Sequence, residues 1–160
     1  NTFIVLYFMN HFHESQNFSN LLLSVYYGIG ALFTLIGGKM GDKHGYRTFV
    51  RLGFLLAFPA ALILAWTDSS ILGILCLIIL GAALNLTYSP MVVLGQQYLP
   101  NRVGLASGIT LGLAVSVGGI TAPLLGKVGD MYGLETTFYV IALITLIPLI
   151  SSFTLPKPKK

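Results

Sequence analysis

Five long apolar runs are the feature that most limits what this sequence can fold into. They occupy residues 18–38, 46–66, 70–95, 103–126 and 134–155, and charged residues lie near their ends or between them. A helix rises ~1.5 Å per residue, so about twenty residues cross the ~30 Å hydrocarbon core of a bilayer. The runs are continuously apolar and do not alternate, which favours helices over a β-barrel. The sequence therefore predicts an all-α integral membrane protein.

The composition excludes an ordinary water-soluble domain. Of the 160 residues, 55% are hydrophobic and only 9% are charged, and the mean hydropathy is +0.83. A soluble domain has about 25% charged residues, and one of this size could not bury so much apolar surface. The net charge of +4 is spread over short segments between the runs. We therefore expect no nucleic-acid partner.

A sixth apolar run, residues 2–12, is too short to cross a membrane. Because it begins at Asn1 without a charged flank, we expect it to be the end of a longer helix whose start is missing from this chain. Prolines inside the runs, such as Pro59 and Pro90, are tolerated in membrane helices as kinks. We expect residues 1–160 to form one unit of six transmembrane helices, the first of them truncated.

The charged residues divide unequally between the two sides that alternating helices would create. One side collects eight of the nine basic residues, namely Lys39, Lys43, Arg47, Arg51, Arg102, Lys157, Lys159 and Lys160. The other side has Lys127 alone and four of the five acids, which are Glu14, Asp68, Asp130 and Glu135. Lys and Arg in short loops are retained in the cytoplasm. The sequence therefore predicts a multi-pass inner-membrane protein whose C-terminus is cytoplasmic.

Four polar residues within the apolar runs are candidates for lining a transport pathway. Asn85 and Tyr88 stand three apart on one helical face just before Pro90, where the backbone is expected to bend. Asn10 and His11 form either a proton-sensitive site or the end of a helix entering the outer interface. For all four, the alternative is a hydrogen bond to a neighbouring helix or to their own backbone.

A ridge of small residues indicates close helix packing. Gly104, Gly108 and Gly112 recur every four residues, which would let another helix approach closely. Pro123 follows a pair of glycines, and a bend or a sliding contact is expected there.

The sequence carries no constellation typical of a membrane enzyme. Ser107-Gly108 is preceded by Leu105 where the nucleophile loop of a serine protease would need glycine. Paired carboxylates and a His-x-x-x-His metal spacing are missing, and Cys76 is the only cysteine. We expect neither enzymatic activity, nor a cofactor, nor a bound metal.

Residues 38–47, Gly-Lys-Met-Gly-Asp-Lys-His-Gly-Tyr-Arg, resemble the signature loop G-x-L-a-D-r-x-G-r-r of the major facilitator superfamily. The positions that match are Gly38, Asp42, Lys43, Gly45 and Arg47. The departures are Met40 for Leu, Gly41 for a usual Ala, and Tyr46 for a usual basic residue. In that family the loop joins helices 2 and 3, with a weaker copy between helices 8 and 9. The resemblance covers essentially the whole chain.

Two further segments indicate which half of that twelve-helix fold the chain resembles. Residues 98–108 look like the start of helix 11, and residues 126–133 look like its outer end. The resemblance thus implies the C-terminal half, helices 7–12. Residues 96–104, together with the following Ser-Gly and Gly-Gly pairs, are similar to the fosmidomycin-resistance branch of drug exporters.

The resemblance implies a secondary transporter in which two six-helix halves rock about a central site. Asp42 and Arg47 are expected to hold the cytoplasmic side closed, with Asp42 facing the positive N-terminal end of the helix that begins near Val103. Lys43 and Arg51 are expected to act only as topology anchors. The implied partners are the lipid bilayer, a small organic substrate, protons and a missing N-terminal half. Proton-coupled drug efflux is expected; a metabolite importer, or a non-transporting six-helix remnant or half-unit, stays open as an alternative.

Overall fold

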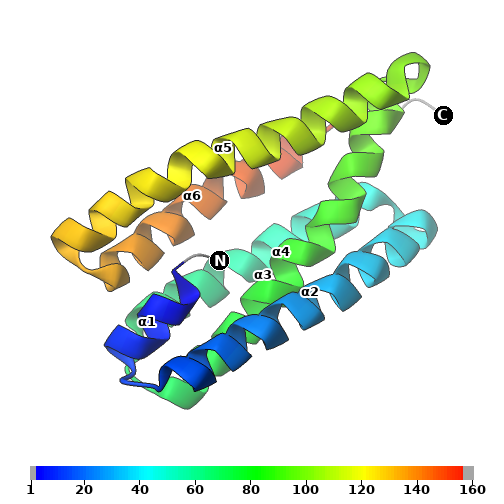
Figure 1. Cartoon of the computed structure of the whole chain (residues 1–160). Coiled ribbons are helices and arrows are strands. Elements are labelled where there is room, and N and C mark those ends of the chain that lie inside the picture. The colour runs from blue at the N-terminus through cyan, green and yellow to red at the C-terminus, as the bar shows by residue number, and fades with distance from the viewer. Residues whose placement is uncertain (1–2, 157–160) are drawn as a thin grey trace.

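The computed structural model describes residues 3–156 as a set of helices that run back and forth beside one another (Figure 1). The helices are α1 (Ile4–His11), α2 (Gln16–His44), α3 (Tyr46–Trp66), α4 (Ser70–Tyr98), the 3-10 turn η1 (Pro100–Arg102), α5 (Val103–Tyr132) and α6 (Leu134–Thr154). Five helical segments, all but α1, are long and apolar enough to cross a membrane by length and composition. The predicted all-helical membrane class is confirmed.

The turns between helices are short because glycine and capping residues end the helices abruptly. Gly45 and Gly133 have φ of 92° and 89°, a conformation that side chains disfavour. Each of these glycines is the only residue between two helices, α2 and α3 in the first case, α5 and α6 in the second. At the start of α2, the Ser15 hydroxyl accepts from the Phe18 N–H at 3.3 Å, an N-terminal cap.

The signature segment is mostly helical, which corrects the prediction of a glycine-punctuated loop. Helix α2 continues through Gly41 to His44, and only Gly45 makes the turn. The other glycines serve packing instead. A Cβ atom at Gly41 would lie 2.6 Å from the Tyr46 ring, and one at Gly38 would lie 2.9 Å from the Ser89 hydroxyl. Glycine here makes room for neighbours and does not bend the chain.

Helix α4 occupies the middle of the packing, between α2 and α3, while α3 also packs against α6 (Figure 1). The main buried cluster joins these helices with α1. Its fully buried members include Tyr7, Phe8, Ala61, Leu64 and Ala142. Small residues on α3 let its neighbours approach, since van der Waals packing drives helix association in lipid.

Glycines allow the closest of these crossings. A Cβ atom at Gly37 on α2 would overlap the Leu86 carbonyl of α4, and one at Gly53 on α3 would overlap the Thr87 methyl group of α4. Both positions therefore require glycine, because the α4 backbone in one case and the branched Thr87 side chain in the other leave no room for a Cβ atom. These contacts lock α2, α3 and α4 together.

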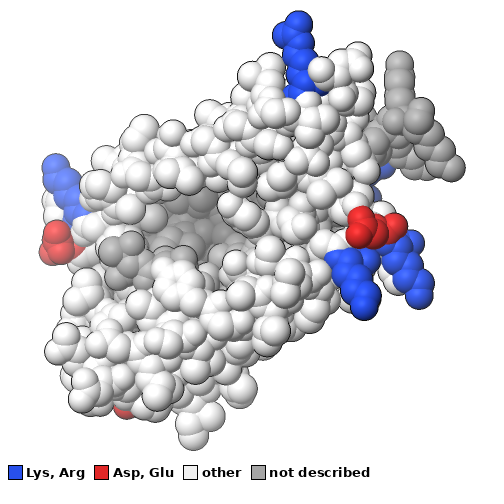
Figure 2. Space-filling view, turned by 45° about the vertical axis from the view of Figure 1, so that its right-hand side comes forward, with Lys and Arg blue, Asp and Glu red and all other residues white. Residues whose placement is uncertain are grey.

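The charged residues gather at the two ends of the helices (Figure 2). We define the basic end as the one with the α2–α3 and α4–α5 turns; its charged residues are Lys39, Asp42, Lys43, Arg47, Arg51 and Arg102. We define the acidic end as the one with the α1–α2, α3–α4 and α5–α6 turns; its charged residues are Glu14, Asp68, Lys127, Asp130 and Glu135. Lys157, Lys159 and Lys160 lie outside the described residues.

Helix α5 is the least covered of the long helices. It packs mainly against α4 and α6, and Ala106 is its only buried residue. The glycine ridge at Gly104, Gly108 and Gly112 has no neighbouring atom within 4 Å of an added Cβ among the described residues. The predicted packing of this ridge is thus not made within the described chain, because α5 turns it away from its neighbours. Pro123, also exposed, likewise belongs to an uncovered part of α5.

A hollow opens between the α5 side and the α2 side of the molecule (Figure 2). The part of it in view carries no coloured atom, so no described Lys, Arg, Asp or Glu is seen there. The charges visible in this view lie at the ends of the helices instead.

Candidate functional site

At the basic end, the last turn of α2 and the first turn of α3 face each other across Gly45. The Tyr46 hydroxyl donates a hydrogen bond to the Asp42 carboxylate. The tyrosine ring lies against Gly41, where a side chain would displace it. Tyr46, which departs from the family signature, thus supplies a donor to the signature acid.

Arg47 lies next to this pair and lines the same pocket. The pocket has a volume of about 500 Å³ and is lined by Gly41, Asp42, Gly45, Tyr46, Arg47, Thr48, Arg51, Leu94 and Gln97. The Arg47 Nε atom is buried and has no hydrogen-bond partner among the described residues. A buried guanidinium nitrogen without an acceptor is costly, so this pocket offers an unsatisfied donor. Lys43 is exposed.

The contact expected for Asp42 is different from the one observed. No hydrogen bond or ion pair among residues 3–156 joins Asp42 to Val103 or Gly104 at the start of α5. The Asp42 carboxylate instead accepts a hydrogen bond from the Tyr46 hydroxyl, across the α2–α3 turn. The gating roles of Asp42 and Arg47 stay predictions.

Arg51 does more than the topology anchor predicted from the sequence. Its Nε donates to the Ser152 carbonyl at 3.0 Å, and its Nη2 donates to the Phe153 carbonyl at 3.2 Å. Its guanidinium carbon also lies 5.1 Å from the centre of the Phe153 ring. Sequence reasoning missed this link for two reasons. The bonded residues are about a hundred positions apart, and both acceptors are backbone carbonyls, which every residue has.

At the acidic end, His11 joins three parts of the chain. Its Nδ1 lies 2.8 Å from the Glu135 carboxylate at the start of α6. Its Nε2 lies 3.0 Å from the Thr67 carbonyl at the end of α3, and 3.8 Å from the Asp68 carboxylate. His11 is the last residue of α1. Of the two expectations left open for it, the position at a helix end is observed, and the proton-sensitive site stays a prediction.

An aromatic residue holds the His11 ring in place. The Tyr7 ring stacks on it at 5.0 Å with an angle of 9° between the planes. The Tyr7 hydroxyl donates to the Leu64 carbonyl at 2.7 Å, so both side chains cap the last carbonyls of α3. Asn10, the neighbour of His11, is exposed and lines an adjacent pocket of about 470 Å³.

Asn85 and Tyr88 have different surroundings in the structure. The Asn85 amide donates to the Gly81 carbonyl of its own helix at 2.8 Å. It also packs against Gly30, where a Cβ would lie 2.7 Å from its Nδ2. Tyr88 is 51% exposed. For Asn85 the backbone-bonding alternative is the observed one, and pathway roles for the predicted residues stay predictions.

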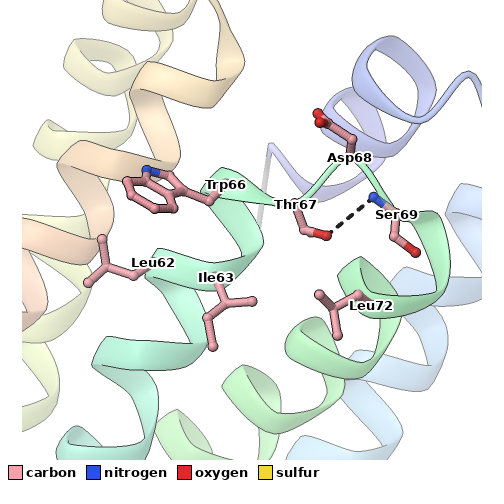
Figure 3. Close-up of a pocket in the computed structure, with 7 residues that line it drawn as sticks. All are labelled: Leu62, Ile63, Trp66, Thr67, Asp68, Ser69 and Leu72. Atoms are coloured by element: carbon pink, nitrogen blue, oxygen red, sulfur yellow. Dashed lines mark hydrogen bonds between the residues drawn. The ribbon is translucent and has the colours of Figure 1, made fainter.

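A second acidic-end pocket, of about 620 Å³, lies beside the α3–α4 turn (Figure 3). It is lined by Leu62, Ile63, Trp66, Thr67, Asp68, Ser69 and Leu72. The Ser69 N–H donates to the Thr67 hydroxyl at 3.2 Å and shapes the turn. None of the residues predicted from the sequence lines this pocket.

Among residues 3–156, no group of three or more His, Cys, Asp or Glu is placed to hold a metal ion. Hydrogen-bonding side chains gather at the two ends of the helices. The buried donor of Arg47 lies at one end, and the His11 acceptor cluster lies at the other.

Comparison with known proteins agrees with the transporter signature. The family profile described as the Major Facilitator Superfamily matches residues 1–160. The chain is 35% identical over 160 residues to the uncharacterized MFS-type transporter YfnC of Bacillus subtilis (strain 168), covering 99% of this chain and 38% of that protein. It is 33% identical over 153 residues to the fosmidomycin resistance protein of Escherichia coli (strain K12), covering 95% of this chain and 37% of that protein.

A more distant relative is the MFS-type transporter ppzB of Metarhizium majus (strain ARSEF 297). It is 28% identical over 148 residues, which are 88% of this chain and 32% of that protein. The chain thus spans between 32% and 38% of the length of these three relatives. No solved structure matches the chain.

Proposed function

This chain belongs to the Major Facilitator Superfamily, and from that membership we propose that its protein is a secondary transporter that exports a small organic molecule in exchange for protons. In this proposal the chain is the C-terminal six-helix half, helices 7–12, and works with an N-terminal half in the inner membrane. The observation that carries the proposal is the 33% identity to a fosmidomycin resistance protein over 95% of the chain.

The distribution of charge supports a membrane orientation with the basic end in the cytoplasm. The basic end has five of the six described Lys and Arg residues, whereas Lys127 is the only one at the acidic end. Positive residues in short loops stay on the cytoplasmic side. The pocket with Asp42 and Arg47 would then face the cytoplasm, where a gate could close during the transport cycle.

The hollow beside α5, whose visible part shows no charged residue (Figure 2), supports a cargo path between two halves. Secondary transporters of this kind bind their cargo near the bilayer midplane, between two repeats. The glycine ridge of α5, uncovered within the described chain, offers a surface that the N-terminal half could approach closely.

Export can be tested in everted inner-membrane vesicles that contain the full-length protein. ATP-driven acidification of the lumen is expected to drive accumulation of fosmidomycin, and collapse of the pH gradient by nigericin is expected to abolish it. Vesicles without the protein are the control. Accumulation in right-side-out vesicles, driven by an inward proton gradient, would instead indicate an importer. Equal accumulation in vesicles with and without the protein would contradict the proposal for this drug.

A further inference from the structure

We infer that His11 and Glu135 form a proton-binding site at the acidic end, and that the bound proton holds α1 against the ends of α3 and α6. The inference rests on the proposed proton-coupled transport, because it names the group in this half that binds the coupled proton. The evidence for it is the pair of contacts that the two ring nitrogens of His11 make with Thr67 and Glu135.

Both nitrogens of the His11 ring face acceptors. The Thr67 carbonyl oxygen, 3.0 Å from Nε2, can only accept, so Nε2 carries a hydrogen. The Glu135 carboxylate oxygen lies 2.8 Å from Nδ1, the distance of an ion pair when His11 is protonated. A neutral imidazole has one N–H and can satisfy one of these contacts. One added proton would therefore let the ring satisfy both contacts at once.

The surroundings place that proton on His11. Glu135 lies in the first turn of α6, where the helix dipole favours a negative charge. The Thr67 carbonyl lies at the C-terminal end of α3, where the dipole favours a positive one. The Asp68 carboxylate, 3.8 Å from Nε2, adds a second negative charge. The face of the Tyr7 ring against the imidazole suits a cation too.

Of the other titratable groups around the site, His13 is the one that lines the same pocket and could add a positive charge. Glu14, in the α1–α2 turn, accepts from the Ser70 hydroxyl at 2.6 Å. The remaining groups on the surrounding elements are Tyr139 of α6, the exposed His13 of the α1–α2 turn, and the exposed Lys127 and Asp130 of α5. Lys127 and Asp130 do not line the pocket beside His11.

Protons can reach the site from the aqueous side. The His11 side chain is 13% exposed and the Glu135 side chain is 57% exposed. Both line the pocket of about 470 Å³ at the acidic end. A proton from water converts neutral His11 to imidazolium, and its return to water leaves one ring nitrogen with a lone pair facing an acceptor. One of the two contacts of His11 is then lost, so α1 is held less firmly, by the Tyr7–Leu64 hydrogen bond and by buried Tyr7 and Phe8.

Hydrogen exchange in the full-length protein tests the site without any transport. Amides of α1 are followed at about pH 5.5 and about pH 8.5, on either side of the range in which histidine titrates, after correction for the intrinsic exchange rate. Wild-type α1 is expected to lose protection at least about tenfold at the higher pH. His11→Gln and Glu135→Gln are expected to remove this pH response, and His13→Gln is expected to keep it. A wild-type α1 with equal protection at both pH values would overturn the inference.

Transport measurements then separate this inference from the proposed function. His11→Gln and Glu135→Gln are expected to lower gradient-driven accumulation about tenfold and to leave exchange of labelled for unlabelled fosmidomycin intact. Asp130→Asn is expected to behave as wild type. If His11→Gln accumulates the drug as wild type does, the site is not the coupling site and the proposed export stands. If wild type moves no drug, the proposed function fails and the exchange experiment still decides the proton site.

Discussion

Arg51 on α3 donates from Nε to the carbonyl oxygen of Ser152 on α6, 3.0 Å away. Ser152 belongs to the last turn of α6, which ends at Thr154, and carbonyls there have no partner within the helix. The second donor of the guanidinium reaches the next carbonyl, at Phe153. Arg51 therefore links the C-terminal end of α6 to α3.

This link predicts that Arg51→Lys destabilises the protein although it preserves the charge. Lysine lacks the planar fork that bonds two carbonyls at once. The loss of one or two charge-assisted hydrogen bonds is expected to cost about 1–3 kcal/mol of unfolding free energy. Thermal unfolding of the protein in detergent measures it, with Lys39→Arg as the control. A topology anchor needs only a positive charge. If Arg51→Lys were as stable as wild type, Arg51 would act as a topology anchor alone.

The glycine crossings predict opposite effects for two identical substitutions. Gly53→Ala is expected to force α3 away from the Thr87 methyl group and to cost about 1–3 kcal/mol of stability. Gly28→Ala on α2 meets no described atom within 4 Å and is expected to be neutral or stabilising by up to about 1 kcal/mol, since alanine favours helix. The melting temperatures of both variants, compared with wild type, measure these changes in stability. Equal melting temperatures would show that the α3–α4 crossing is not tight.

The contact between Tyr46 and Asp42 predicts that both residues matter to transport. Asp42→Asn is expected to lower the transport rate about tenfold, the effect of losing a hydrogen bond to a charged group, while membrane insertion stays intact. Tyr46→Phe removes the donor of the same bond and is expected to act in the same direction. Lys43→Gln, which changes an exposed side chain, is the control. Wild-type turnover in Asp42→Asn would rule out the gating role.

The orientation is open to a labelling experiment. A cysteine at Asp68→Cys is expected to react with a membrane-impermeant thiol reagent in intact cells, because Asp68 is fully exposed at the acidic end. A cysteine at Lys43→Cys is expected to react only after permeabilisation. Cys76 is buried and should stay unlabelled. Labelling with the reverse pattern would place the basic end outside, against the positive-inside rule.

Periodic and local features of the fold were predictable from the sequence. Helix α3 runs from Tyr46 to Trp66, the bounds of the third apolar run, because a single glycine at position 45 and the polar turn after Trp66 end it sharply. The signature segment identified the family. Its conformation was less predictable, because glycines that allow a loop also allow a helix to pack closely, and only the neighbouring helix shows which is used.

Contacts between distant segments could not be predicted in the same way. His11 was a candidate, but neither Glu135 nor the Thr67 carbonyl could be assigned to it, since the partners are set by how three helices end at one level of the membrane. The glycines that make the closest contacts within the described chain were not predicted either. A four-residue spacing marks Gly104 and Gly108, whereas Gly37 and Gly53 stand in no repeat and still make the closest approaches.

The tight fit of Gly37 and Gly53 against α4 has a consequence for how such a molecule could change shape. Three helices that meet without slack have no room to slide past one another, so α2, α3 and α4 must travel as a single rigid piece. The helices that can then move are α1 and α5. Helix α1 is held partly by the contact of His11 with Glu135, and the outer face of α5 is uncovered within the described chain. Compounds or antibody fragments meant to arrest the proposed transport cycle would gain most by binding those two helices.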